Sequence, residues 1–137
     1  MDYRKLAEQF MIDSFGAEPP FTPPEDMSKG EAGILTYLSF FHNNVLAGEL
    51  SKQLRLTSGR IAIALKGLER KGYVKRKRDE KDHRKVIVTV TPKGKEHATK
   101  QKEHALNSVE AILKHLGEED SKEFIRLFHK IYGISDK

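Results

Sequence analysis

The segment that most constrains the fold is 74–94, where a dense run of charge gives way to an alternating apolar strand. Residues 73–78 favour one strand, and the valines that alternate through 86–90 favour a second. The polar residues 79–85 between them have the length of a hairpin loop. A helix is expected to start at Thr91–Pro92, because threonine can cap it and proline at the first helical position lacks only an N–H that has no partner there. The segment therefore predicts a β-hairpin with a charged tip that leads directly into a helix.

Two short helical patterns joined by a tight turn precede this hairpin. The first lies within 47–56 and has leucines four residues apart. The second lies within 58–72, where Thr57 or Ser58 can cap it and Gly72 ends it. Its basic side chains point away from its apolar face, so the pair predicts a helix-turn-helix. The inward residues of the second helix are expected to be Ile61, Ala64, Leu65 and Leu68.

An earlier helix and a short strand complete the central region. Ser28 and Glu31 have the spacing of a capping box, which predicts a helix start. The turn-forming residues 42–44 predict the end of that helix. Residues 45–46 favour a short strand. Together with the hairpin, these elements predict a winged helix-turn-helix, mainly α with a small β-hairpin wing.

Amphipathic helices are expected at both ends of the chain. Residues 3–14 carry an apolar stripe, and the Pro-rich stretch 16–26 predicts an extended connector. A long helix is expected to run from 92 to Gly117, with a last helix over 118–132. A chain this small cannot easily hide both stripes, so we expect a homodimer, with packing back onto the chain's own core as the alternative. The seam of the long helix is expected at Ala98, Ala105, Val109, Ile112 and Leu116, and that of the last helix at Phe124, Leu127, Phe128 and Ile131.

The 137 residues are enough for one structural domain. Within it we expect three regions. Residues 1–27 are the N-terminal dimerisation helix and its Pro-rich connector, 28–94 the winged helix-turn-helix, and 95–137 the C-terminal dimerisation helices. The class is therefore α+β, dominated by helices.

Charge is distributed unevenly along the sequence. Residues 51–100 hold 16 Lys or Arg against 5 Asp or Glu, whereas the rest of the chain is acidic. Such a concentration favours a polyanionic partner, with a solvated basic face as the alternative. The chain has no cysteine and no uncharged apolar run near the roughly 20 residues of a membrane span. We therefore expect a cytoplasmic protein with no membrane partner.

The central segments resemble the MarR family of transcription regulators. Residues 68–76, Leu-Glu-Arg-Lys-Gly-Tyr-Val-Lys-Arg, are similar to the family's Leu-Glu-x-x-Gly run into the wing. Residues 82–94 match its Asp-x-Arg, followed by alternating apolar residues, a threonine and a glycine. The resemblance covers about 31–94. It implies a transcription regulator that binds double-stranded DNA as a homodimer on a pseudo-palindromic operator, as a repressor released by a small-molecule effector of unknown identity.

The resemblance and the residue chemistry together indicate a DNA-binding site. Arg84 is expected to enter a groove, because a guanidinium is weakly hydrated and suits a narrow, negative minor groove. Similar proteins imply that Asp82 stabilises the wing by pairing with Arg76 or Arg78. Arg60 is the best candidate for a bidentate guanine contact. The other expected contacts are Ser58 and Lys66 on the second helix of the pair, Ser51 and Lys52 on the first, and Lys75, Lys77, Lys81 and Lys85 in the hairpin.

Three residues depart from the family's usual pattern. Gly59, Ile63 and Gly67 stand where relatives commonly carry polar or basic side chains. We therefore expect sparse direct base readout and more reliance on DNA shape. A winged helix that binds proteins without sequence-specific DNA binding is the alternative function.

Other chemistries have little support in the sequence. His97 and His104 lie seven residues apart, too far for one helix to present them to a single metal ion, so no metal or other cofactor is expected. No nucleophile elbow, phosphate-binding glycine loop or HExxH motif is present, so an enzyme is not expected. An effector cavity could be lined by Phe10, Tyr37, Phe40 and Phe41, although core packing is favoured for each and no effector site is assigned.

Overall fold

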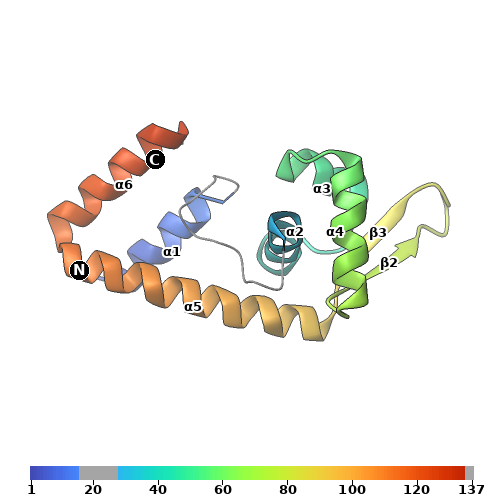
Figure 1. Cartoon of the computed structure of the whole chain (residues 1–137), viewed down its shortest axis with the longest axis horizontal. Coiled ribbons are helices and arrows are strands. Elements are labelled where there is room, and N and C mark those ends of the chain that lie inside the picture. Colours follow the sequence, from blue (N-terminus) through green and yellow to red (C-terminus); the bar gives the residue numbers. More distant parts are fainter. Residues whose placement is uncertain (16–27, 135–137) are drawn as a thin grey trace. The chain divides into compact units, whose positions relative to one another are not determined.

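The computed structural model describes residues 1–15 and 28–134 (Figure 1). In chain order the elements are α1 (Tyr3–Asp13), α2 (Lys29–Phe40), β1 (Val45–Leu46), α3 (Ala47–Leu54), α4 (Ser58–Arg70), β2 (Val74–Arg78), β3 (Val86–Val90), α5 (Pro92–Leu116) and α6 (Glu118–Tyr132). The predicted winged helix-turn-helix class is confirmed. The expected connector at 16–26 lies outside the described residues. None of the helices described is long and apolar enough to span a bilayer.

The described residues form two compact units, and α5 contributes to both. We call residues 28–101 the winged unit, and residues 1–15 with 102–134 the terminal unit. In the winged unit, α4 packs against α2 and α3, and beside them lies an antiparallel sheet in the order β1-β3-β2. Val88 lies at the centre of the sheet, opposite Val45 on one side and Arg76 on the other. The fully buried side chains of this unit include Ile34, Leu38, Leu50, Ile61, Leu65, Leu68, Val74 and Val88.

Local caps and turns set the helix boundaries in the winged unit. The Ser28 hydroxyl accepts the Glu31 N–H at 3.2 Å and starts α2. Of the two candidate caps for α4, Thr57 is the one used, since its hydroxyl accepts the Arg60 N–H at 3.2 Å. Asn44, in the turn after α2, takes a left-handed φ of 55°, which asparagine tolerates better than most residues.

The start of α5 is fastened to the turn before the wing. The Thr91 hydroxyl accepts the Gly94 N–H at 3.0 Å and donates to the Gly72 carbonyl at 2.6 Å, so the predicted cap is confirmed. The Thr91 N–H also donates to the carbonyl of Tyr73. These bonds fix the wing, whose strands enter and leave at this point, against the end of α4.

The terminal unit has a core of its own. Phe10 of α1, Leu113 of α5 and Phe128 of α6 meet in one buried cluster, and the Phe10 and Phe128 rings stand edge to face with centroids 4.8 Å apart. The expected stripe on α1 is confirmed. Arg4 also ties α1 to α5, with guanidinium bonds of 2.6 Å to Glu103 and to Asn107.

The seam predicted for α5 is only partly right. Ala98 and Val109 are buried as expected, but Leu106 and Leu113 take the buried places that had been assigned to Ala105 and Ile112. Ile112 is instead 46% exposed. The difference arises because α1 and α6 of the same chain pack against α5 and so determine which of its faces is buried. The periodicity of α5 alone does not specify that face.

Candidate nucleic-acid interface

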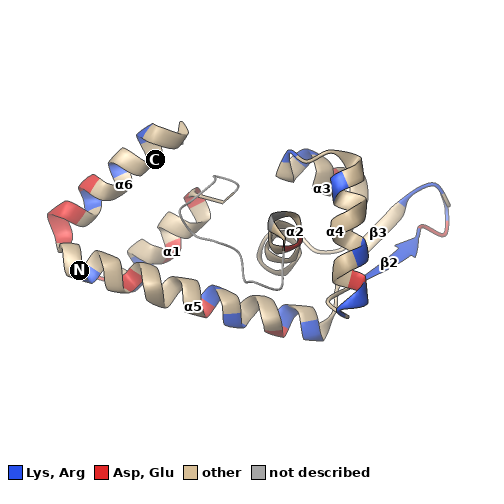
Figure 2. Cartoon of the chain, viewed as in Figure 1, with Lys and Arg blue, Asp and Glu red and all other residues tan. Residues whose placement is uncertain are grey.

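Helix α4 presents its predicted readers to solvent. Ser58, Arg60 and Lys66 are exposed, while the four predicted inward residues are buried. The side chain at the middle of the outward face is Ile63, which is 74% exposed. Figure 2 shows basic residues on α3, on the outer side of α4 and along β2.

Gly67 does not belong to this outward face. It is buried, and a Cβ at its position would lie 3.0 Å from the Glu31 carboxylate of α2. That carboxylate is only 13% exposed and binds the Lys71 ammonium at 2.6 Å. The absence of a side chain at Gly67 is therefore explained by helix packing, and only Gly59 and Ile63 remain as departures on the outward face.

The wing tip is organised around Asp82. Its Oδ1 accepts the Arg84 backbone N–H at 3.1 Å and the Arg84 Nε–H at 3.2 Å. These bonds, with the charge of Lys85, hold the pKa of the Asp82 carboxyl below its usual range. The Arg84 side chain remains 92% exposed, because only Nε is engaged. The tip therefore presents a guanidinium with its two terminal nitrogens directed to solvent.

The predicted pairing of Asp82 with Arg76 or Arg78 is wrong. Arg76 binds Glu69 at the end of α4, through Nε at 2.9 Å and a terminal nitrogen at 2.6 Å. Arg78 makes no ion pair with any residue that the structure describes. Asp82 lies in a tight turn whose own backbone and following arginine satisfy it, so it needs no partner on β2. Arg76 still braces the wing, but against α4.

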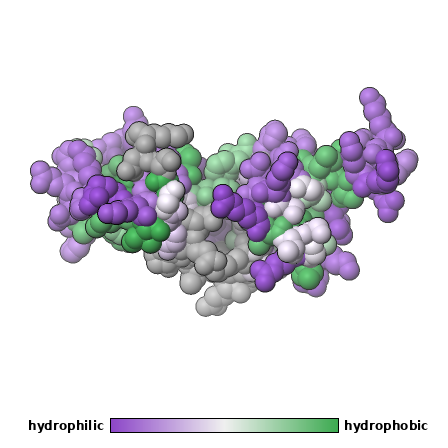
Figure 3. Space-filling view, turned by 90° about the horizontal axis from the view of Figure 1, so that it is seen from above, coloured by the Kyte–Doolittle hydropathy of each residue, from purple (hydrophilic) through white to green (hydrophobic). Residues whose placement is uncertain are grey.

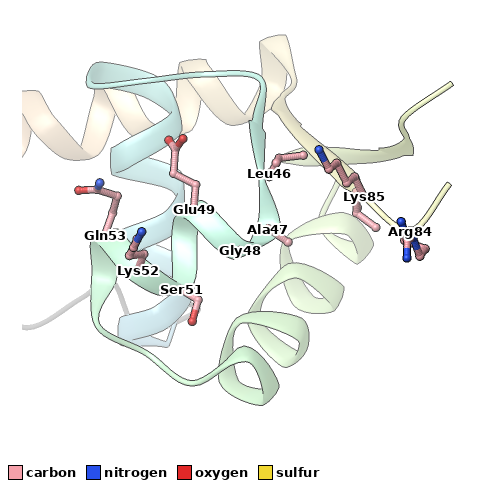
Figure 4. Close-up of a pocket in the computed structure, with 10 residues that line it drawn as sticks. Leu46, Ala47, Gly48, Glu49, Ser51, Lys52, Gln53, Arg84 and Lys85 are labelled. Carbon is pink, nitrogen blue, oxygen red and sulfur yellow. The ribbon is translucent and has the colours of Figure 1, made fainter. Parts of the chain in front are cut away.

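A shallow open groove of about 860 Å³ lies between α3 and residues 84–86, where the wing loop enters β3 (Figure 4). It brings together four of the predicted phosphate or groove contacts, Ser51, Lys52, Arg84 and Lys85. The other lining residues are Leu46, Ala47, Gly48, Glu49, Gln53 and Val86.

Two polar side chains that line the groove, those of Glu49 and Ser51, are bonded within the chain. The Glu49 carboxylate accepts the Tyr37 hydroxyl at 2.9 Å, and burial, followed by this bond and the Glu49 charge, raises the pKa of Tyr37. The Ser51 hydroxyl donates to the Leu56 carbonyl at 2.5 Å and stabilises the turn after α3. The Ser51 hydroxyl is thus engaged within the chain, and its phosphate contact stays a prediction. Figure 3 shows hydrophilic residues gathered at the free end of the wing.

The remaining predicted lysines lie in the wing loop and on its outer strand. Lys75, Lys77, Lys81 and Lys85 are all exposed. Lys77 lies 3.7 Å from Glu80, an exposed pair that screening makes weak. The loop is closed by backbone bonds from Asp79 N–H to the Lys85 carbonyl and from Lys85 N–H to the Asp82 carbonyl.

Two asparagines that sequence reasoning treated only as turn formers also hold the wing. The Asn43 side-chain oxygen accepts the Val90 N–H at 3.0 Å, and the Asn44 oxygen accepts the Thr89 hydroxyl at 2.7 Å. Their adjacency before a short strand was the only available signal. Within residues 1–15 and 28–134, no three acidic or histidine side chains come together as a metal site.

Comparison with known proteins places this geometry in a class. Residues 31–109 match the model of the winged helix DNA-binding domain family, and the chain belongs to that family. The matched range includes most of α2, the helix-turn-helix, the wing and most of α5. The class defined by fold and site is thus a DNA-binding transcription regulator.

Particular relatives and solved structures are transcription regulators with this fold. The structure of Streptococcus pneumoniae FabT in complex with DNA is similar with a TM-score of 0.70 and 26% identity, over 96% of each chain. A MarR transcriptional regulator from Methanosarcina mazei shares the fold with a TM-score of 0.65 and 24% identity, over 96% of this chain and 88% of its own. The HTH-type transcriptional regulator BilQ of Clostridium symbiosum is 34% identical over 85 residues, which are 61% of this chain and 58% of BilQ. The resemblance to the MarR family is confirmed.

Proposed function

We propose that this protein binds an operator as a homodimer and represses transcription until a small-molecule effector releases it. One observation carries the DNA-binding part of this proposal: two basic surfaces lie in the same compact unit. They are the outward face of α4 and the wing tip, where the Arg84 side chain is 92% exposed. A recognition helix in the major groove and a wing along the backbone or in the minor groove would use both surfaces at once. The DNA in the FabT complex supports this placement by analogy.

The proposed residue roles follow from exposure and chemistry. Arg84 enters the minor groove, held by Asp82, and Arg60 contacts base edges from the first turn of α4. Lys52, Lys81 and Lys85 bind phosphates, together with Ser58 and Lys66 on the edges of α4. The lysines are individually replaceable, because phosphate contacts contribute charge rather than sequence information. None of these roles is catalytic, and we infer a protein without enzymatic activity.

The homodimer is supported by apolar side chains that the terminal unit leaves uncovered. Ile131 is 75% exposed and Ile12 is 56% exposed, with Ile112 and Leu127 between 40 and 50%. A second copy is the proposed occupant, because an operator with two half-sites about 10 base pairs apart requires two recognition helices related by a twofold axis. The small-molecule response rests on the resemblance alone.

The test is a mobility shift with DNA from beside the protein's own gene, titrated with salt. Affinity is expected to fall steeply, with a log–log slope of about −0.9 per neutralised phosphate. Arg84→Ala should weaken binding by roughly 5- to 150-fold, which corresponds to about 1–3 kcal/mol for a groove contact. The matched control is Arg126→Ala in the terminal unit, another exposed arginine that pairs with a nearby carboxylate, Glu123. Equal effects of the two changes would remove the wing from the interface.

A further inference from the structure

Ile63 is an apolar side chain on a surface that is otherwise built for an anion. It is 74% exposed at the middle of α4, roughly opposite the centre of the buried face. Its placement is not a consequence of core packing, since the core of this unit is filled by the other side of the helix. An isoleucine so exposed gives up the stabilisation that burial provides unless another molecule covers it.

The neighbours of Ile63 make it project. Gly59 lies one turn earlier, and a Cβ there would meet open space. Ala62, the preceding residue, is exposed and small. With a glycine and an alanine beside it, the isoleucine is not covered by either of these neighbours.

The rim around Ile63 is cationic. Arg60, Lys66 and Arg70 are exposed, and none of the three makes an ion pair with another described residue. The single carboxylate in α4, Glu69, is bound by Arg76. An apolar centre inside an uncompensated positive rim fits the major groove of DNA, whose walls are phosphates and whose floor is base edges.

The major-groove floor has one apolar group for such a side chain to contact. Base edges there offer hydrogen-bond donors and acceptors, and the thymine C5 methyl is the apolar exception. We propose that Ile63 reads the C5 methyl of thymine, so that the operator half-site has a required A·T pair beneath the middle of α4. This inference rests on the proposed function and deepens it, because it makes Ile63 a specificity determinant where sequence comparison had indicated a loss of readout.

The experiment crosses a protein variant with a DNA variant. Sites are first selected from random duplexes with the wild-type protein, and each thymine of the selected site is then replaced in turn by deoxyuridine, which lacks only the methyl. Wild type should lose about three- to tenfold in affinity at one uridine position per half-site. Ile63→Ala should lose less than about twofold from the same replacement, which defines a coupling between side chain and methyl.

The control variant is Lys66→Ala. It should weaken binding to every duplex and lower the salt slope, yet keep the wild-type loss at the uridine position. Thermal unfolding of Ile63→Ala checks that the fold is intact, which its exposure predicts.

The outcomes separate the two proposals. If wild type selects no sequence, the operator-binding function itself fails, and Ile63 with it. If wild type selects a site but no single uridine costs more than about twofold, or if Ile63→Ala shows the full wild-type loss, only the methyl readout is overturned.

Discussion

Gly94 shows how much a single residue can constrain this fold. A Cβ at its position would clash with the Tyr73 carbonyl, because it would lie 2.9 Å from the carbonyl carbon of Tyr73. It would also lie 2.9 Å from the Val90 side chain. The Tyr73 carbonyl oxygen is also the acceptor of the Thr91 N–H, so it cannot move away without losing a backbone bond. The glycine of the family motif is explained here by close approach of α5 to the turn before the wing.

We predict that Gly94→Ala lowers the free energy of unfolding by at least about 2 kcal/mol, because a backbone clash must be relieved by separating α5 from that turn. The matched control is Gly48→Ala in α3, where a Cβ would meet nothing. That change should be neutral or stabilise by about 0.4–1 kcal/mol through the unfolded chain. Urea unfolding of both variants measures the difference, and similar midpoints would contradict the packing assigned to Gly94.

In the wing turn, the negatively charged Asp82 is bonded to Arg84, the proposed DNA contact. Asp82→Asn removes a carboxylate from a DNA-facing loop, so long-range electrostatics alone would strengthen binding. We predict the opposite, a loss of about three- to tenfold, because the carboxylate orients the Arg84 guanidinium through a charge-assisted bond. Fluorescence anisotropy with a labelled operator measures the DNA affinity of wild type and of the variant. Stronger binding by the variant would show that Asp82 only repels DNA.

The pH dependence of this pair has a definite sign. The folded-state pKa of Asp82 is lowered. The stabilisation from the Asp82–Arg84 pair is therefore complete when the pH is above the usual carboxyl pKa range, and it is lost only as the pH falls through the lowered pKa. Between about pH 6 and 8 the carboxylate is ionised, and wild type and Asp82→Asn should keep a constant affinity ratio.

The same elements show what the sequence could and could not predict. The hairpin loop, the cap at Thr91 and the bounds of α6 follow from local turn chemistry and periodicity, and the structure confirms them. The partner of Asp82 depends on the exact path of a seven-residue loop, and the buried face of α5 depends on which helices cover it. Turn geometry decides the first and contacts with distant helices decide the second. The family resemblance therefore implied the wrong partner for Asp82, and the periodicity of α5 gave a shifted seam.

For the whole molecule, the decisive question is what covers the exposed apolar residues of the terminal unit. Leu127 and Ile131 are four residues apart on α6 and so share one face, beside the row that holds Phe124 and Phe128. Phe128 is buried in the cluster, whereas Leu127 is 43% and Ile131 is 75% exposed. The intrachain core therefore uses only part of the apolar width of α6.

We predict that Ile131→Glu raises the dimer dissociation constant at least about 100-fold. Burying an isoleucine contributes about 1.5–3 kcal/mol, and a twofold interface loses that contribution twice. The control is Lys130→Glu, which changes the charge more at the adjacent exposed position and should leave the dimer intact. Light scattering across a micromolar dilution series measures the mass of each. If wild type has a monomer mass at every concentration in the series, the dimer would have to form only on DNA. Ile131 would then not contribute to association of the free protein.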